Sequence, residues 1–322
     1  MNYSDDYFNE EIRDGYRINA MMKRYWAANM EVLAEIDRIC RELNIVYLAE
    51  FGTLLGAVRH RGYIPWDDDI DISMTRDAFE VFRREAPELL TGGMTIYNNL
   101  HTAFGPMRVV NTIAPQIAPD FLAKYHGCPY SAGVDIYILD KVPADEKESN
   151  AFKMLQNSIR YLAQRFETKK TSISDYQKYY GNDGHSERDV AEMLNRVEKE
   201  TGVHINREAD VAIQLTELLN TVQGKYWDSD CDKVVHMHNW CRERSKPTDI
   251  AYYTEIVRLK FENMEISCPI EYDKVLMERF GSDYMTPKQI GACHEKAYAK
   301  SQKILLDTFA ACGIQPPAEY LE

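Results

Sequence analysis

The residues with the clearest chemical potential lie in the stretch EFGTLLGAVRHRGYIPWDDDIDISM, which runs from Glu50 to Met74. Asp67, Asp68 and Asp69 are consecutive, and Asp71 follows after a single isoleucine. Carboxylates at such short spacing repel one another. Burying them beside apolar residues costs free energy unless a positive charge compensates. The pattern therefore predicts a site that receives a cation.

Residues 68–74 are predicted to form a strand. Alternate residues of a strand share a face, so Asp69 and Asp71 project together while Ile70 and Ile72 can pack into a core. Paired carboxylates are ligands that Mg²⁺ or Mn²⁺ prefers, and we expect such an ion here. The alternative is a solvated acidic loop, which the apolar neighbours disfavour.

The two other aspartates, Asp67 and Asp68, could cap the preceding turn or hydrogen-bond a metal-ligating neighbour. Gly52 and Thr53 come between a predicted strand, 45–52, and a short helix. Glycine allows backbone amides to approach a phosphate, and a helix N-terminus favours an anion. An ordinary turn with Thr53 as the helix cap is the alternative.

Three basic residues follow, Arg59, His60 and Arg61. They could contact the phosphate oxygens of a donor, or form a solvated helix end where cations suit the helix dipole. A second acidic strand is predicted at GVDIYILD, where Asp135 stands opposite the apolar face formed by Val134 and its alternate neighbours. Asp135 is a candidate third metal ligand or general base, and a buried structural aspartate is the alternative.

These motifs resemble the LicD family, which includes phosphocholine transferases of bacterial surface glycans and fukutin-type proteins. The resemblance centres on FGTLLGAVRHRGYIPWDDDIDISM, continues through VDIYILDKVP, and ends with KFENMEISCPIEYDKVLMERFGSDYM. The first motif is long and specific, the other two are weaker, and all three occur in the expected order. The chain departs from the family at Tyr137 and Ile138, where many members carry Phe-Pro.

The resemblance implies a nucleotidyltransferase-like fold and a cell-surface polysaccharide role. It implies transfer of a phospho-alcohol, such as phosphocholine, from a CDP-linked donor to a glycan or lipid-linked glycan, with release of CMP. The carried-over positions are Gly52 and Thr53 for the donor, and Asp69, Asp71 and Asp135 for metal and catalysis. Glu262 matches a family Phe-Glu pair whose role, structural or functional, the sequence leaves open.

Composition narrows the class of protein. The chain has 322 residues, with 38 basic and 51 acidic ones, so its formal net charge is 38 − 51 = −13. Such a chain lacks the basic face expected of a nucleic-acid-binding protein. Seven cysteines at scattered spacings argue against a disulfide framework. No signal peptide and no membrane-spanning stretch is recognisable, so we expect a cytoplasmic protein, with peripheral membrane association possible for a lipid-linked acceptor.

The expected fold class is α+β, with a mixed β-sheet flanked by helices, a helical insertion and C-terminal helices. Residues 1–145 are predicted to form the catalytic core. Residues 146–322 are predicted to be a mainly helical region that includes a β-hairpin turning near Asn263. The predicted helices span residues 18–43, 76–90, 146–222 with a break, 271–281 and 288–309. The break, at 181–189, is the best candidate linker.

Two weaker constellations remain. Cys231, His236, His238 and Cys241 suggest zinc, but their spacing is not that of a standard finger, and 233–240 also fits a strand with both histidines on one face. Aromatic residues near the motifs could form a cage for a quaternary ammonium, but an ordinary core or surface position is favoured for each of them. These residues are Tyr63, Trp66, Tyr130 and Tyr137.

Other functions share the same acidic motif. A nucleotidyltransferase that uses an NTP and a small-molecule acceptor would also bind a metal-bound pyrophosphate. A glycosyltransferase with a D-x-D metal site is a second alternative, but it leaves the Gly52-Thr53 turn without a role. The sequence does not choose between choline, ribitol and another alcohol, and it identifies neither the acceptor nor the oligomeric state.

Overall fold

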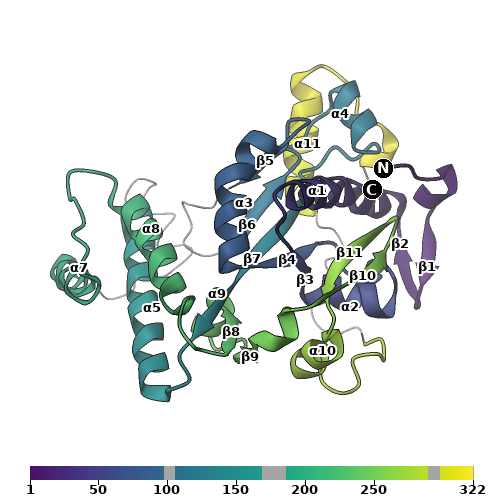
Figure 1. Ribbon diagram of the computed structural model, residues 1–322. Helices are drawn as coiled ribbons and strands as arrows, with labels where there is room; N and C mark the ends of the chain where they lie inside the picture. Colours follow the sequence, from purple (N-terminus) through teal and green to yellow (C-terminus); the bar gives the residue numbers. More distant parts are fainter. Residues whose placement is uncertain (98–105, 169–185, 289–297, 322) are drawn as a thin grey trace. The chain divides into compact units, whose positions relative to one another are not determined.

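The computed structural model describes residues 1–97, 106–168, 186–288 and 298–321 (Figure 1). It is an α+β protein, as the sequence predicts, and the chain divides into two compact units. One unit contains Met1–Tyr97, Met107–Tyr137 and Ala251–Glu322, and the other contains Asn98–Pro106 and Ile138–Ile250.

The sheet of the first unit carries the acidic motifs. Its strands lie side by side in the order β3 (Leu48–Ala49), β4 (Asp71–Thr75), β7 (Gly133–Val142), β6 (Met107–Val110) and β5 (Thr95–Tyr97) (Figure 1). β3 and β4 are antiparallel, as are β5 and β6. β6 and β7 are also antiparallel, and their register places Arg108 opposite Asp135.

Helices flank this sheet, and two small hairpins complete the unit. The helices are α1 (Ala20–Glu42), α2 (Phe51–Arg59), α3 (Arg76–Leu89), α4 (Pro119–Lys124), α10 (Tyr272–Phe280) and α11 (Ala299–Ala311). The hairpins are β1 (Glu11–Arg13) with β2 (Tyr16–Ile18) and β10 (Ile256–Phe261) with β11 (Met264–Pro269). Short 3₁₀ turns cover Asp5–Phe8, Ile250–Tyr253 and Ala318–Tyr320.

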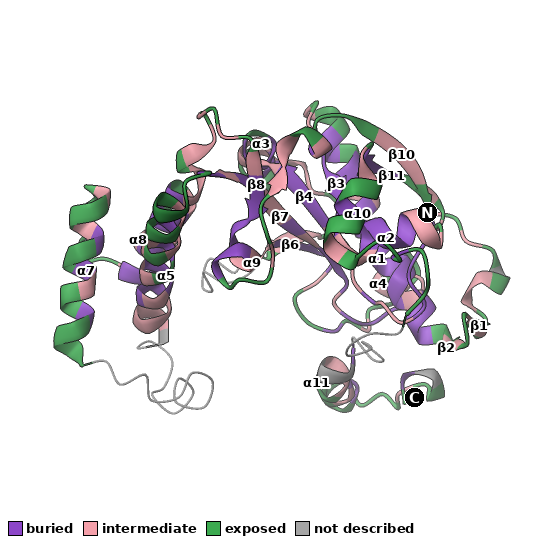
Figure 2. Cartoon of the chain, turned by 90° about the horizontal axis from the view of Figure 1, so that it is seen from below, coloured by how far each residue is buried: buried purple, intermediate pink, exposed green. Residues whose placement is uncertain are grey.

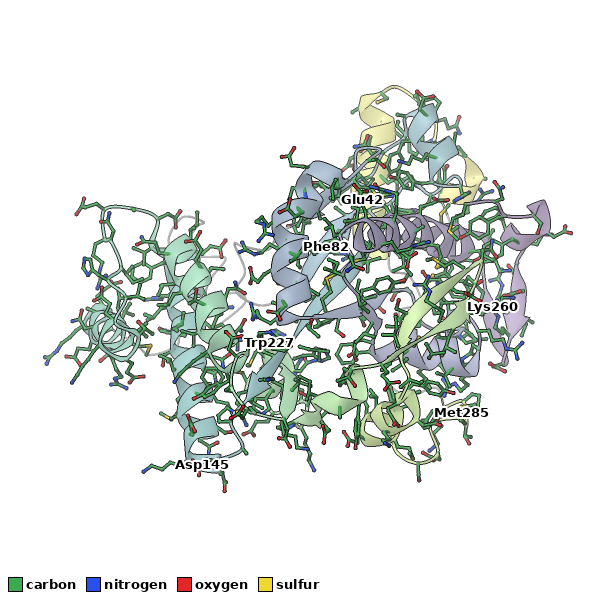
Figure 3. The ribbon with its side chains drawn as sticks, in the orientation of Figure 1. Glu42, Phe82, Asp145, Trp227, Lys260 and Met285 are labelled. Carbon is green, nitrogen blue, oxygen red and sulfur yellow. The ribbon has the colours of Figure 1, made fainter. Side chains whose placement is uncertain are left out.

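The core of the first unit forms around α1. This helix begins after Asn19, whose side-chain oxygen accepts a hydrogen bond from the Met22 amide at 2.8 Å. Trp26 is fully buried and stacks on Tyr63, with ring centroids 4.6 Å apart. Phe82 of α3, labelled in Figure 3, is also fully buried. Most residues of α1 are buried (Figure 2). The helix predicted at 18–43 is confirmed, with bounds Ala20–Glu42.

The second unit is mainly helical. Its helices are α5 (Glu146–Thr168), α7 (Glu187–Thr201), α8 (Val211–Gln223) and α9 (Met237–Cys241), with a 3₁₀ turn at Gly224–Tyr226. Strand β8 (Lys233–His236) pairs with the second half of β7 and with β9 (Thr248–Asp249). α5 packs against α8 and α7 through a shared apolar core that includes Ile159, Leu194 and Leu215.

Three predicted strands are shorter than expected. The strand predicted at 68–74 begins only at Asp71, so Asp69 and Ile70 precede β4. Only Leu48–Ala49 of the predicted strand at 45–52 pairs, because Phe51 takes a left-handed backbone conformation, with φ of 44°, and starts α2. Gly52 and Thr53 therefore lie inside the first turn of a helix rather than before it. The strand predicted at 233–240 ends at His236, where α9 begins, so His236 and His238 do not share a strand face.

The hairpin predicted to turn near Asn263 and the helix predicted at 271–281 are confirmed. The hairpin turns at Glu262 and Asn263, and α10 ends before Gly281, whose φ is 90°. The greater part of the candidate linker at 181–189 and the start of the helix predicted at 288–309 lie outside the described residues. In the described parts of the chain, the helices are too short or too polar to cross a membrane.

Candidate active site

Side chains of α1 hold the aspartate loop in place. The indole Nε1 of Trp26 donates to the carbonyl of Asp67 at 2.9 Å, and Asn29 Nδ2 donates to the carbonyl of Asp68 at 2.9 Å. The side-chain oxygen of Asn29 accepts from the amide of Gly133, at the start of β7, at 2.8 Å. One fully buried asparagine therefore fixes both acidic segments to the same helix.

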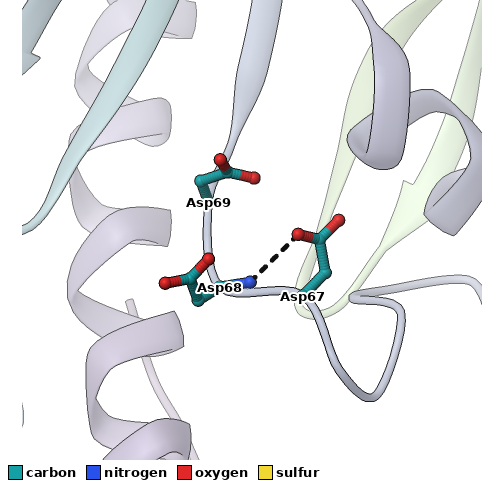
Figure 4. A group of neighbouring side chains, drawn as sticks. All are labelled: Asp67, Asp68 and Asp69. Atoms are coloured by element: carbon teal, nitrogen blue, oxygen red, sulfur yellow. Dashed lines mark hydrogen bonds between the residues drawn. The ribbon is translucent and has the colours of Figure 1, made fainter. Parts of the chain in front are cut away.

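Asp67, Asp68 and Asp69 form a compact acidic group (Figure 4). One carboxylate oxygen from each residue lies within 4.8 Å of the other two. Among the described residues, no other group of three or more potential metal ligands lies so close together. The amide of Asp68 donates to Asp67 Oδ1 at 3.2 Å, which fixes the turn between them. Side-chain packing on both sides of the loop leaves these charges half-buried or buried.

Asp71 and Asp135 extend this group. The amide of Asp135 donates to the carbonyl of Ile70 at 2.9 Å, so the two acidic segments are direct neighbours. Burial, followed by the negative charges of Asp69, Asp135 and Asp67, raises the pKa of Asp71 well above its ordinary value. The structure therefore brings together the three carboxylates that the sequence selected, Asp69, Asp71 and Asp135.

Asp67 occupies a position that the sequence did not assign. Its carboxylate lies against the backbone of Gly52, where a Cβ on that residue would overlap it. Burial and the charges of Asp69 and Asp68 raise the pKa of Asp67 to about 8. The carboxylate thus stands beside the first turn of α2, whose dipole is positive at that end.

The residues predicted to bind the donor phosphate, apart from Gly52, fall into two sets. Thr53 is buried, and its hydroxyl oxygen accepts from the amide of Asp71 at 2.9 Å, which ties α2 to β4. Arg59 donates to the carbonyl of Tyr284 at 2.7 Å, and His60 contacts Asp14 at 3.1 Å.

Arg61 is exposed, and its carbonyl accepts from the amide of Glu262 at 3.0 Å. Arg59, His60 and Arg61 all lie at the far end of α2, about 10 Å along the helix from Gly52. The structure places Gly52 and Thr53 beside the aspartates and gives the three basic residues other contacts.

A different cation faces the acidic group. Arg108 of β6 lies opposite Asp135, with Nε 3.3 Å from its Oδ1. Burial raises the pKa of Asp135 to about 6, against the lowering effect of the arginine. The Arg108 side chain retains 36% of its exposure, so it can also reach a ligand. Sequence reasoning missed Arg108 because its place depends on the register of two strands about 25 residues apart.

A buried ion pair supports the same site from α10. Glu50 is fully buried, pairs with Arg279, and accepts a hydrogen bond from Ser73 Oγ at 3.1 Å. The Arg279 guanidinium stacks over the ring of Phe51 at 4.2 Å, and Phe51 in turn contacts Tyr137 with centroids 5.1 Å apart. These contacts hold the left-handed turn that starts α2.

Glu262 has a structural role in this arrangement. Its Oε1 accepts from the amide of Tyr63 at 3.1 Å, and its Oε2 accepts from Tyr7 at 3.3 Å. A Cβ on Gly62 would overlap the same carboxylate. Glu262 therefore fastens the β10–β11 turn to the loop that follows α2. The sequence alone left open whether its role is structural or functional.

The aromatic residues considered for a cage have different surroundings. Tyr63 and Tyr130 are almost fully buried, and each stacks on another ring, Trp26 and Tyr298 respectively. Tyr137 is half-buried, and the charges of Asp71, Asp135 and Asp69, after burial, raise its pKa. The ring of Trp66 contacts those of Tyr16 and His60, with centroids 6.4 and 6.5 Å apart, while Tyr137 lies near the carboxylates of Asp71 and Asp135.

The four candidate zinc ligands do not assemble. No three of them approach closely enough to share an ion, since the group of such residues found in the described chain is the aspartate one. Cys241 Sγ donates to Gln156 Oε1 at 3.5 Å, and His238 Nε2 contacts Arg242 Nη1 at 3.2 Å. The spacing that suggested zinc therefore reflects a strand followed by a short helix.

The acidic group fits a hard divalent cation. Its donor atoms are all carboxylate oxygens, which Mg²⁺ and Mn²⁺ prefer. The raised pKa values of Asp67 and Asp71 have the same cause, uncompensated negative charge in a buried place, which a cation would relieve.

Comparison with known proteins agrees with this reading of the fold. Residues 44–100 match the family model described as LicD/FKTN/FKRP, nucleotidyltransferase domain. A lipopolysaccharide cholinephosphotransferase LicD of Haemophilus influenzae is 45% identical over 53 residues, which is 16% of this chain and 20% of that protein. An uncharacterized protein of Rickettsia typhi is 36% identical over 87 residues, 25% of this chain and 28% of its own length.

Residues 44–100 thus resemble the nucleotidyltransferase domain of the LicD family. The segment matched includes Gly52, Thr53, Asp69 and Asp71, and it confirms the resemblance seen in the first motif. The matched region spans between a fifth and just over a quarter of the curated relatives. Asp135 and the two later motifs lie outside it, so their assignment to the family pattern stays a prediction.

Proposed function

We propose that the protein is a metal-dependent transferase that moves a phospho-alcohol from a CDP-linked donor to a glycan hydroxyl and releases CMP. The observation that carries the proposal is the convergence of Asp69, Asp71 and Asp135 beside Arg108. Carboxylates alone would repel a pyrophosphate donor, so a site of this kind requires cations. The cholinephosphotransferase name of the Haemophilus relative supports phosphocholine as the first donor group to test.

In this proposal, Asp69 and Asp71 hold Mg²⁺ or Mn²⁺, with Asp67 beside them and Asp135 completing the set. When bound, the ion would neutralise the donor phosphates. The first turn of α2, which the Asp67 carboxylate flanks at Gly52, offers backbone amides to a phosphate, and Arg108 offers a planar guanidinium. Each of these groups acts on charge that the donor brings.

The proposed transfer balances as a simple displacement. The acceptor hydroxyl oxygen bonds to the phosphorus that bears the alcohol, and the bond from that phosphorus to the CMP oxygen breaks. Asp135 takes the hydroxyl proton, for which its pKa of about 6 suits it near neutral pH. CMP leaves as a phosphate monoester, and positioning rather than covalent catalysis supplies the rate.

The test supplies the full chain with Mg²⁺ and a panel of CDP-linked alcohols, CDP-choline first, with and without a lipopolysaccharide-type acceptor. We expect acceptor-dependent CMP release and incorporation of the alcohol phosphate into the glycan. Pyrophosphate release from an NTP would instead identify a nucleotidyltransferase, and release of a nucleoside diphosphate from a sugar nucleotide would identify a glycosyltransferase. Either of these results without CMP release contradicts the proposal.

The proposal includes a cytoplasmic location, with the acceptor either free or carried on a lipid at the membrane surface. Cell fractionation tests the location, and flotation with vesicles that carry a lipid-linked glycan tests the peripheral contact. Binding to such vesicles that is lost when the glycan is omitted would support a lipid-linked acceptor.

A further inference from the structure

A second charged cluster lies in the helical unit, between α5 and α9. Four residues on one face of α5 follow at spacings of three, four and seven, Lys153, Gln156, Asn157 and Arg160. Asn157 Nδ2 donates to the carbonyl of Cys241 at 3.5 Å, and Arg160 Nη1 donates to Asn157 Oδ1 at 3.2 Å. This face therefore packs against the end of α9.

α9 and the residues after it add more positive charge. Arg242 and Arg244 are exposed, and the Lys153 ammonium lies 4.6 Å from the centroid of Trp240. We call Lys153, Arg160, Arg242 and Arg244, together with His238, the α5–α9 basic cluster. The cluster is notable in a chain of formal net charge −13.

Two buried donors of this region lack an acceptor within the described residues. Gln156 is fully buried, and its Oε1 already accepts from Cys241, while no acceptor faces its Nε2. His238 Nδ1 is also buried without a partner. Leaving a buried donor unsatisfied costs roughly 1–3 kcal/mol, so two in one region indicate a missing acceptor.

The tautomer of His238 follows from its neighbour. An arginine nitrogen can only donate, so His238 Nε2 accepts from Arg242 Nη1 at 3.2 Å, and the ring proton sits on Nδ1. Burial, together with the charges of Arg242, Arg160 and Arg244, lowers the pKa of His238 to about 4. At neutral pH the ring therefore offers one N–H and no charge.

These positive charges exclude a metal cation and favour an anion. We propose that the α5–α9 basic cluster binds a phosphate-class oxyanion, with the side-chain donors of Gln156 and His238 facing it and Lys153 and Arg244 supplying charge. A tetrahedral oxyanion has enough lone pairs for both neutral donors and the flanking cations. The ligand is either free phosphate or the phosphoryl group of a phosphorylated sugar, and the inference does not depend on the proposed transfer reaction.

The test is calorimetric titration of the full chain with inorganic phosphate, in EDTA and at constant ionic strength. We expect saturable binding at one site. Lys153→Gln and Arg244→Gln should each weaken it about threefold, as expected for partly exposed charges, and together about tenfold. Gln156→Leu should weaken binding and stabilise the ligand-free protein, because it removes a buried unpaired amide.

Two variants act as controls. Arg196→Gln changes the same charge on the exposed face of α7, and Arg108→Gln removes the cation of the candidate active site. Both should leave phosphate affinity within twofold of that of the unchanged protein. A parallel titration with glucose 6-phosphate distinguishes the sources, since affinity at least tenfold higher than for phosphate points to a phosphorylated sugar, and equal affinity points to free phosphate.

Three results would overturn the proposal. The first is the absence of saturable binding. The second is an equal loss in Arg196→Gln, which would show a general charge effect. The third is loss of binding in Arg108→Gln with binding retained in the Lys153→Gln/Arg244→Gln double variant, which would move the anion to the other unit.

Discussion

The carboxylate of Asp67 lies against the backbone of Gly52, in the space that a Cβ would occupy. Glycine is required there by a close approach and not by its backbone angles, since Gly52 is an ordinary residue of α2. Replacing a helical glycine by alanine usually stabilises a protein by roughly 0.5–1 kcal/mol. Whether Gly52→Ala stabilises or destabilises the protein therefore tests the contact between Gly52 and Asp67.

Gly52→Ala should destabilise the protein by about 1–3 kcal/mol and displace Asp67, with loss of donor affinity. Urea unfolding measures the first effect, and calorimetry with a CDP-alcohol and Mg²⁺ measures the second. Combining it with Asp67→Ala provides the control, because Gly52→Ala should then become neutral or stabilising. An unchanged cost in the double variant would show that the contact with Asp67 is not its cause.

Asp71→Asn should abolish transfer while raising stability in the absence of divalent cations. The change removes a buried charge that Asp69, Asp135 and Asp67 oppose. We expect turnover to fall at least about 10²-fold, because the variant loses a negative charge that is positioned in the site to stabilise the reaction. Asp77→Asn, at an exposed position of α3, is the matched control. Normal turnover in Asp71→Asn would exclude this residue from the site.

The carboxylates could be predicted because their information is local. Alternation separates Asp69 and Asp71 from Ile70 and Ile72, and both isoleucines are fully buried, although β4 itself begins only at Asp71. The helices of both units, the α+β class and the hairpin could likewise be predicted from periodicity and turn residues.

The supporting residues could not be found this way. Asn29 sits within a largely buried helix, and its two hydrogen bonds reach segments about 40 and 104 residues away. Arg108 depends on the β6–β7 register, and Asp67 depends on how α2 begins. The sequence placed three basic residues near the acidic motif, Arg59, His60 and Arg61. Proximity in sequence did not show that they lie at the opposite end of α2 from the aspartates.

Stability without metal should fall as pH rises through the neutral range. The pKa of Asp67 is raised to about 8 in the folded protein, so the folded state holds a proton that the unfolded state has already lost above about pH 4. Stability then decreases with pH between these values, because the folded state binds more protons. Thermal unfolding in EDTA at pH 5 and pH 8 should show the lower Tm at pH 8.

Asp67→Asn should flatten that dependence, and Mg²⁺ should raise the Tm most at pH 8, where the carboxylates are ionised. A Tm that rises from pH 5 to pH 8 in EDTA would show that these carboxylates do not control the stability.

Arg108→Gln should reduce kcat/KM for the CDP-alcohol by roughly 10²-fold, since it removes a charge-assisted contact to the donor. Arg108→Lys keeps the charge but not the planar fork, so it should restore only part of the loss. Without the arginine, the pKa of Asp135 should rise further, and the acidic limb of the pH–rate profile should move to higher pH. A profile that does not move would contradict the coupling between the two residues.

The buried pair of Glu50 and Arg279 provides the last prediction. Arg279→Met should destabilise the protein by about 3 kcal/mol, because it leaves a fully buried carboxylate without its guanidinium. The double variant Glu50→Gln/Arg279→Met should recover much of this stability, since no buried charge remains. Arg84→Gln, which breaks an exposed pair with Glu85, should cost less than about 1 kcal/mol.

Activity separates the structural role of this pair from its electrostatic one. Arg279 also acts on Asp71 and stacks on Phe51, which starts α2. The double variant should therefore fold but transfer more slowly, because the turn at Phe51 loses its support. Urea unfolding and CMP release on the same preparations decide the matter, and a double variant with full activity would show that the pair stabilises the fold without positioning the site.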